Sequence, residues 1–145
     1  MANANSDVET LNSFLRGELS AVETYRQAIG HVDNDRVRDQ LQDCMQDHEH
    51  RVSSIRDRIT KLGGMPTDSS GPWGTFAKLV QAGADALGEK AAIQALEQGE
   101  DHGLADYQRD IDKTHGEARR FVRTELIPAQ KRTHDNLSRI KKTYH

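Results

Sequence analysis

Two glutamates occupy positions where the helical pattern calls for apolar residues. Each stands in the middle of a repeat, which reads Leu11, Leu15, Glu18, Val22, Tyr25, Ile29 in one segment and Ile93, Leu96, Glu100, Leu104, Tyr107, Ile111 in another. Steps of three and four residues put all members of a repeat on one helix face. A buried carboxylate must be neutralised, paired or bound to a cation. The matching pair therefore indicates a shared polar centre.

Two further segments each contribute one polar residue to an apolar face. His48 lies near the centre of the stripe formed by Leu41, Met45, Val52 and Ile55, and Gln130 falls on the stripe of Leu126, Thr133, Leu137 and Ile140. The candidate metal-binding set is thus Glu18, His48, Glu100 and Gln130. Carboxylate and imidazole groups bind iron and other divalent metals, whereas an amide oxygen is a weak ligand. We expect Tyr25 and Tyr107 to donate hydrogen bonds to the carboxylates.

The segment Asp47-His48-Glu49-His50 imitates a metal-binding pair, because Asp47 and His50 have the spacing of Glu-x-x-His. Projection at 100° per residue places His50 roughly 160° and Asp47 about 100° from the centre of the apolar stripe. Both should therefore lie at the surface or its margin. His48 is the inward candidate.

The apolar periodicity predicts helices over residues 7–31, 34–62, 89–114 and 116–143, the first capped by Ser6-Asp7. Gly63-Gly64-Met65-Pro66 should end the second helix, and Pro128 should kink the fourth. The crossover 63–88 should contain a short helix near 75–87 and be anchored by Trp73. It is long enough to span a bundle, which would make the second and third helices parallel. We therefore expect an all-α four-helix bundle with one long crossover, forming a single domain over residues 1–145.

Composition limits the classes of function. The chain is 34% hydrophobic, 5% aromatic and 30% charged, which suits amphipathic helices rather than a sheet. A formal net charge of -3 argues against nucleic acid or anionic lipid as a partner. No apolar run approaches the roughly 20 residues of a membrane span, and the N-terminus does not resemble a signal peptide. With a single cysteine, Cys44, these features predict a cytoplasmic protein.

Several motifs resemble the ferritin-like superfamily. The run from Glu18 to Tyr25, with Ala21 between them, is similar to the first-helix motif of bacterioferritins and rubrerythrins. Leu62-Gly63-Gly64-Met65-Pro66 resembles the end of their second helix, and Gly99-Glu100 with Tyr107 resembles their third-helix motif. Over nearly the whole chain the likeness is greatest to a bacterial four-helix-bundle family labelled domain of unknown function 2383. The resemblance implies a ferritin-like bundle.

The sequence departs from the superfamily at the metal site. The resemblance implies Glu-x-x-His pairs on the second and fourth helices. The first pair falls here on His48 and Arg51, and the second on Gln130 and Thr133 or, in another alignment, on Lys131 and His134. Neither alignment keeps a bridging carboxylate. We expect Arg51 to take the place of a cation and to pair with Glu18 or Glu100.

Three hypotheses for function follow. The first is a non-catalytic ferritin-like bundle with a degenerate two-metal site, without catalytic residues, acting through its surface or by self-association, with a role in stress physiology. The alternative is an iron-binding or other metal-binding protein with storage or weak oxidase activity at the reduced Glu/His site. The third, coating of DNA as by mini-ferritins, is disfavoured by the net charge of -3. A homodimer is the commonest assembly for such a chain, and the sequence names no protein partner.

Overall fold

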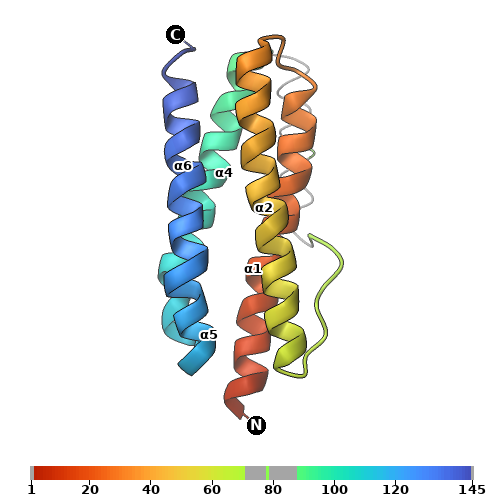
Figure 1. Ribbon diagram of the computed structural model, residues 1–145, viewed down its shortest axis with the longest axis vertical. Helices are drawn as coiled ribbons and strands as arrows, with labels where there is room; N and C mark the ends of the chain where they lie inside the picture. The colour runs from red at the N-terminus through yellow and green to blue at the C-terminus, as the bar shows by residue number, and fades with distance from the viewer. Residues whose placement is uncertain (1, 71–77, 79–87, 145) are drawn as a thin grey trace.

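The computed structural model describes residues 2–70, 78 and 88–144. Its helices are α1 (Ala2–Ile29), α2 (Asp35–Lys61), α4 (Glu89–Asp110), α5 (Gly116–Phe121) and α6 (Ile127–Lys141) (Figure 1). A short 3-10 turn, η1 (Ile111–Lys113), follows α4, and a π-helical turn, η2 (Val122–Leu126), joins α5 to α6. The four predicted helical segments are confirmed. The short helix expected near 75–87 and Trp73 lie outside the described residues.

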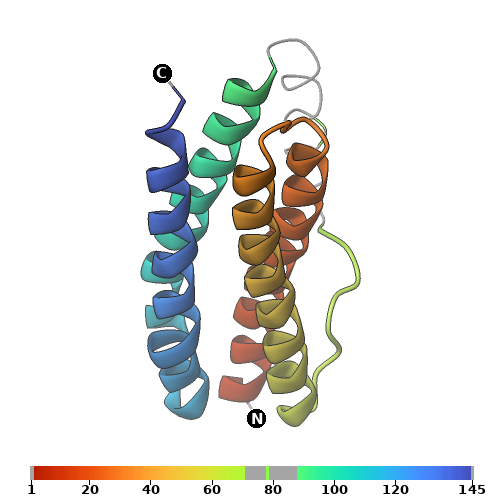
Figure 2. The same ribbon diagram turned by 45° about the horizontal axis from the view of Figure 1, so that its top comes forward.

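The helices form the expected bundle with one crossover. α1 and α2 are antiparallel neighbours joined by a short turn, whereas α2 and α4 run in the same direction (Figures 1 and 2). The segment after α2 turns back along the bundle, and Asn12 of α1 holds it at two points. The Asn12 amide nitrogen donates to the Met65 carbonyl at 3.0 Å, and its oxygen accepts from the Thr67 backbone N–H at 2.8 Å. The predicted ferritin-like connectivity is thus confirmed.

Residues at the turns explain where α2 begins and ends. The Asn34 side chain accepts a hydrogen bond from the Val37 backbone N–H at 3.0 Å, which satisfies a free donor of the first turn. At the other end Gly63 has φ +82°, a left-handed conformation that favours glycine, as predicted for a helix stop. The predicted Ser6-Asp7 cap of α1 is wrong, because the helix already starts at Ala2. Asp7 instead accepts hydrogen bonds from the backbone and ring of His115, 3.1 and 3.0 Å away.

The last helix differs from the prediction of a single helix kinked at Pro128. Its π-helical turn precedes the proline, and the Ile127 backbone N–H reaches the Val122 carbonyl, five residues back. Proline has no N–H to continue the α-helical ladder, so a wider turn next to it is a low-cost way to rearrange the bonds. The extra residue in this turn sets which residues of α6 face the bundle interior.

Two apolar clusters fill the two halves of the bundle. One includes Leu11, Leu15, Ile55, Phe121 and Leu126, and the other includes Ala28, Leu41, Ile93, Leu137 and Ile140. The polar residues of the next subsection lie between these two apolar clusters. Within the described part of the chain, no helix is long and apolar enough to cross a membrane.

Candidate functional site

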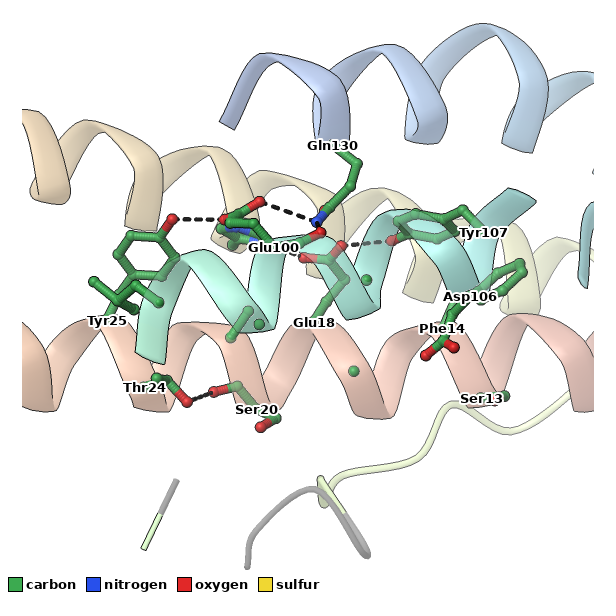
Figure 3. Close-up of a pocket in the computed structure, with 16 residues that line it drawn as sticks. Ser13, Phe14, Glu18, Ser20, Thr24, Tyr25, Glu100, Asp106, Tyr107 and Gln130 are labelled. Atoms are coloured by element: carbon green, nitrogen blue, oxygen red, sulfur yellow. Dashed lines mark hydrogen bonds and ion pairs between the residues drawn. The ribbon is translucent and has the colours of Figure 1, made fainter. Parts of the chain in front are cut away.

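All four predicted inward polar residues meet in the middle of the bundle, one from each long helix. Glu18 comes from α1, His48 from α2, Glu100 from α4 and Gln130 from α6, and none is more than 4% exposed. Figure 3 shows Glu18, Glu100 and Gln130 pointing toward one another, with Tyr25 and Tyr107 on either side. The fold therefore brings the four predicted side chains together in the middle of the bundle.

His48 lies between the two carboxylates. Its Nδ1 is 2.5 Å from Glu18 Oε2, and its Nε2 is 2.7 Å from Glu100 Oε2. An ionised carboxylate can only accept, so both ring nitrogens must donate, and the ring is then a positively charged imidazolium. Burial alone would lower the pKa of His48, but the charges of Glu100 and Glu18 outweigh burial and raise that pKa to about 9.

Arg51, one turn after His48, supplies the second positive charge and is only 2% exposed. Its guanidinium donates to Glu18 Oε1 at 3.3 Å, to the Gln130 side-chain oxygen, to the Ala129 carbonyl at 3.0 Å and to Thr133 Oγ1 at 2.8 Å. The prediction that Arg51 pairs with Glu18 or Glu100 is confirmed for Glu18. The three contacts on α6 tie that helix to α2 through one planar group.

Glu100 accepts four hydrogen bonds, two on each carboxylate oxygen. Thr133 Oγ1 and Gln130 Nε2 donate to Oε1 at 2.7 and 3.0 Å, and Tyr25 OH and His48 Nε2 donate to Oε2 at 2.6 and 2.7 Å. These are as many bonds as a carboxylate has lone-pair sites. Burial would raise the pKa of Glu100, but His48 and these donors outweigh it and lower the pKa.

Glu18 is held by three donors. Its Oε1 accepts from Tyr107 OH and Arg51, and its Oε2 accepts from His48. Burial raises the pKa of this carboxyl, yet the opposing effect of Arg51 and His48 is larger and lowers it to about 2. The expected tyrosine donors are thus confirmed, with each tyrosine crossing to the carboxylate of the other helix.

The eight side chains Glu18, Tyr25, His48, Arg51, Glu100, Tyr107, Gln130 and Thr133 are called the ionic network below. Its two carboxylates and two cations sum to zero charge, so their mutual attraction and hydrogen bonds can offset the cost of removing four ions from water. Among the described residues, no group of three or more His, Cys, Asp or Glu side chains is arranged to hold a metal ion.

The competing candidates lie outside this network or at its edge. His50 is exposed and Asp47 is half-buried, where it pairs with Arg132 at 2.8 Å and with Arg51 at 3.3 Å. Of the two alignments of the fourth helix, Gln130 and Thr133 point inward. Lys131 is exposed, and His134 is half-buried and contacts Asp101.

Two members of the site were not singled out from the sequence as functional. Thr133 is fully buried and joins Arg51 to Glu100, accepting from one and donating to the other. Gly103 lies so close to Gln130 that an added Cβ would stand 2.7 Å from its side-chain nitrogen. The sequence indicated Thr133 as a member of the apolar stripe and as one alignment of the second Glu-x-x-His pair, but gave it no bonding role. Gly103 stood out only as a small residue three positions after Glu100.

Gly103 and Gly17 offer a matched pair of substitutions. Gly17→Ala should stabilise the fold by up to about 1 kcal/mol, because alanine favours a helix and its Cβ meets no atom within 4 Å. Gly103→Ala should instead destabilise it by roughly 1–3 kcal/mol, because it displaces the Gln130 amide from the Glu100 carbonyl and carboxylate. Urea denaturation measures both, and equal effects would show that Gln130 is not held in place.

The shifted pKa values of His48 and Glu18 predict that the free energy of unfolding is largest between about pH 4.5 and 6.5 and decreases on either side. His48 has a pKa of about 9 in the fold against 6.5 unperturbed. Its contribution to the free energy of unfolding is therefore complete below pH 6.5 and is lost as pH rises toward 9. Glu18 has a pKa of about 2 against 4.5, so its contribution is complete above pH 4.5 and is lost as pH falls toward 2. We expect a decline of a few kcal/mol on the alkaline side in urea denaturation. A His48→Gln control should flatten this limb, and an unchanged limb would contradict a buried imidazolium.

Comparison with known proteins places the fold. The chain superposes with a TM-score of 0.77 on a crystal structure described as ferritin like, diiron-carboxylate proteins from Bacillus anthracis str. Ames, at 17% sequence identity. The match covers 97% of this chain and 99% of that one, and at this identity it shows the fold. No curated protein matches the chain. The sequence profile described as domain of unknown function (DUF2383) matches residues 6–113, and the chain therefore belongs to that family, with the fold of the ferritin-like superfamily.

Proposed function

We propose that this protein is a non-catalytic ferritin-like bundle in which the ionic network replaces a two-metal centre. The observation that carries the proposal is the position of Arg51. Its guanidinium is buried in the middle of the bundle, bonded to Glu18 and to three groups of α6. A permanently charged group there supplies the positive charge that a metal ion would otherwise bring.

The chemistry of the donors supports this proposal. Ferritin-like two-metal sites take a glutamate from each of two helices and a Glu-x-x-His pair from each of the other two. Here Glu18 and Glu100 match the single glutamates, but the two pairs read His48 with Arg51 and Gln130 with Thr133. Arginine has no lone pair to offer a metal, and no bridging carboxylate comes from α2 or α6. The residues present do not fit a two-iron centre.

The geometry of the carboxylates supports the same reading. Every lone-pair site of Glu100 already accepts a hydrogen bond, and Glu18 has three of its four sites in use. A metal ion would have to displace these donors and would meet the charges of His48 and Arg51 a few ångströms away. Like charges at such distances are strongly unfavourable in a buried site.

The alternative is an iron protein with storage or weak oxidase activity at the reduced site. It draws on the described nature of the Bacillus anthracis structure, a diiron-carboxylate protein. In this chain it would require Arg51 to leave the centre of the bundle, at the cost of its bonds to Ala129, Gln130 and Thr133.

Aerobic oxidation of iron(II) separates the two functions. Iron(II) is added to protein freed of metal with a chelator, and the appearance of iron(III) is followed by absorbance, with Glu18→Gln as the matched variant. We expect wild-type protein, variant and protein-free buffer to give the same rate. A saturable, protein-dependent rate that the variant loses would overturn the proposal and favour the alternative.

A non-catalytic centre leaves the surface and self-association as the basis of function, and a homodimer in the cytoplasm is the arrangement we propose. Among the described residues, Met65 is the single large hydrophobic residue that is mostly exposed, at 83%. An interface between copies would then rest on polar and charged contacts. Sedimentation at low and high salt tests this, because a dimer held by such contacts should weaken as salt is added.

A further inference from the structure

A pocket of about 50 Å³ lies between α1 and α4, against the ionic network (Figure 3). Small residues on both helices leave this space, including Gly17 and Ala21 of α1 and Gly99 and Gly103 of α4. A water molecule needs about 10–15 Å³ measured in this way, so the space holds roughly three to five water-sized groups. The pocket is therefore larger than one water molecule and smaller than most metabolites.

The wall of the pocket combines an acceptor with apolar surface. Glu18 lines it and is 4% exposed, and its Oε2 accepts one hydrogen bond among the described residues, from His48. A carboxylate oxygen has two lone-pair sites, so one acceptor site of this buried group is unused. Phe14 and Leu96, both buried, supply apolar wall. The pocket thus suits a molecule with one hydrogen-bond donor and a short alkyl part.

The charge of the surroundings excludes ions as the occupant. Glu18 and Glu100 are balanced by His48 and Arg51, and Asp106, which also lines the pocket, is balanced by Arg109 at 3.1 Å. An added cation or anion would therefore leave a net charge. A neutral hydroxyl group can donate to Glu18 without disturbing this balance.

We propose that the pocket between α1 and α4 binds a small neutral hydroxylic molecule of the size of a short alcohol, whose hydroxyl donates to Glu18. The inference rests on the proposed function, since it takes Glu18 as a hydrogen-bond acceptor and not as a metal ligand. Metal analysis and the titration below are separate measurements, so the two can fail independently.

The test is an NMR titration of the metal-free full-length chain with ethanol, followed through its backbone amide resonances. Acetonitrile is the matched control ligand, because it has the same number of heavy atoms but no donor. We expect saturable shifts at the amides of Gly17, Gly99 and Gly103 with ethanol and none with acetonitrile.

A filled pocket provides the matched variant. A Cβ at Gly17 meets no atom within 4 Å, so Gly17→Val should fit and occupy the space, while Gly17→Ala controls for the loss of glycine. We expect Gly17→Val to weaken ethanol binding at least about tenfold. The proposal would be overturned by shifts that grow linearly with ethanol and do not saturate, or by an equal response to acetonitrile. It would also be overturned if the pocket kept bound water that ethanol does not displace. The comparison of the two ligands decides the matter even where the valine variant does not fold.

Discussion

Replacing Arg51 with methionine is expected to lower the free energy of unfolding by about 3–5 kcal/mol, the usual cost of removing one partner from a buried ion pair. The aliphatic part of the side chain is kept, so packing changes little. Glu18 loses its arginine donor, and the Gln130 oxygen, the Ala129 carbonyl and Thr133 lose theirs. The buried network is then left with two carboxylates and a single cation. Urea denaturation at pH 6 measures the effect.

Arg132→Met is the control for this change. Arg132 also pairs with a carboxylate of α2, Asp47, at 2.8 Å, but its side chain is 59% exposed. Exposed ion pairs contribute about 0–1 kcal/mol, so this variant should lose little. The double variant Glu18→Gln/Arg51→Met should lose less than the two single changes summed, because the carboxylate and the guanidinium stabilise each other. An Arg51→Met variant as stable as wild type would show that the network does not hold the bundle together.

Four substitutions should turn the ionic network into a metal site. His48→Glu with Arg51→His, and Gln130→Glu with Thr133→His, would give Glu-x-x-His pairs on α2 and α6 facing Glu18 and Glu100. This is the ligand set of ferritin-like two-metal proteins, so we expect about two metal ions per chain after loading with iron(II) or cobalt(II). The native side chains at all four positions are buried and point into the same centre.

A partial variant is the control for this gain. Changing Gln130 and Thr133 alone leaves Arg51 and His48 in place, and their positive charge should keep metal out. Elemental analysis and the cobalt(II) absorption spectrum report the result for both variants. A folded fourfold variant that takes up no metal would mean that these positions do not correspond to the two Glu-x-x-His pairs.

The sequence predicted the helices and the inward polar residues well, because both follow from periodicity. Glu18 and Glu100 interrupt regular apolar repeats, and the apolar face of α2 contains His48 but not His50. Arg51 was found instead from the resemblance to the ferritin-like superfamily, whose second-helix pair falls on His48 and Arg51, and the partner of Arg51 was left open between Glu18 and Glu100. A long side chain can reach either of two nearby acceptors. The choice depends on how the helices are rotated and on differences in distance of about an ångström, which periodicity does not determine.

Other features depended on contacts between distant segments. The Asp7 carboxylate suggested a helix cap, but in the fold it bonds to His115, which is 108 positions away. The choice between Gln130 with Thr133 and Lys131 with His134 rested on the phase of α6. That phase is set after the π-helical turn Val122–Leu126, and a pattern of 3.6 residues per turn does not anticipate such a turn.

The metal content of the native protein tests the central claim most directly. The chain is purified without chelator, and its iron, zinc, manganese and copper are measured by elemental analysis, with Glu18→Ala and Glu100→Ala beside it. If the ionic network has no net charge and its carboxylates are occupied by hydrogen bonds, the fully folded wild-type protein should contain only traces of metal, far below one ion per chain. One or two ions per chain, lost in either variant, would contradict the account and make this centre a metal site with unusual ligands.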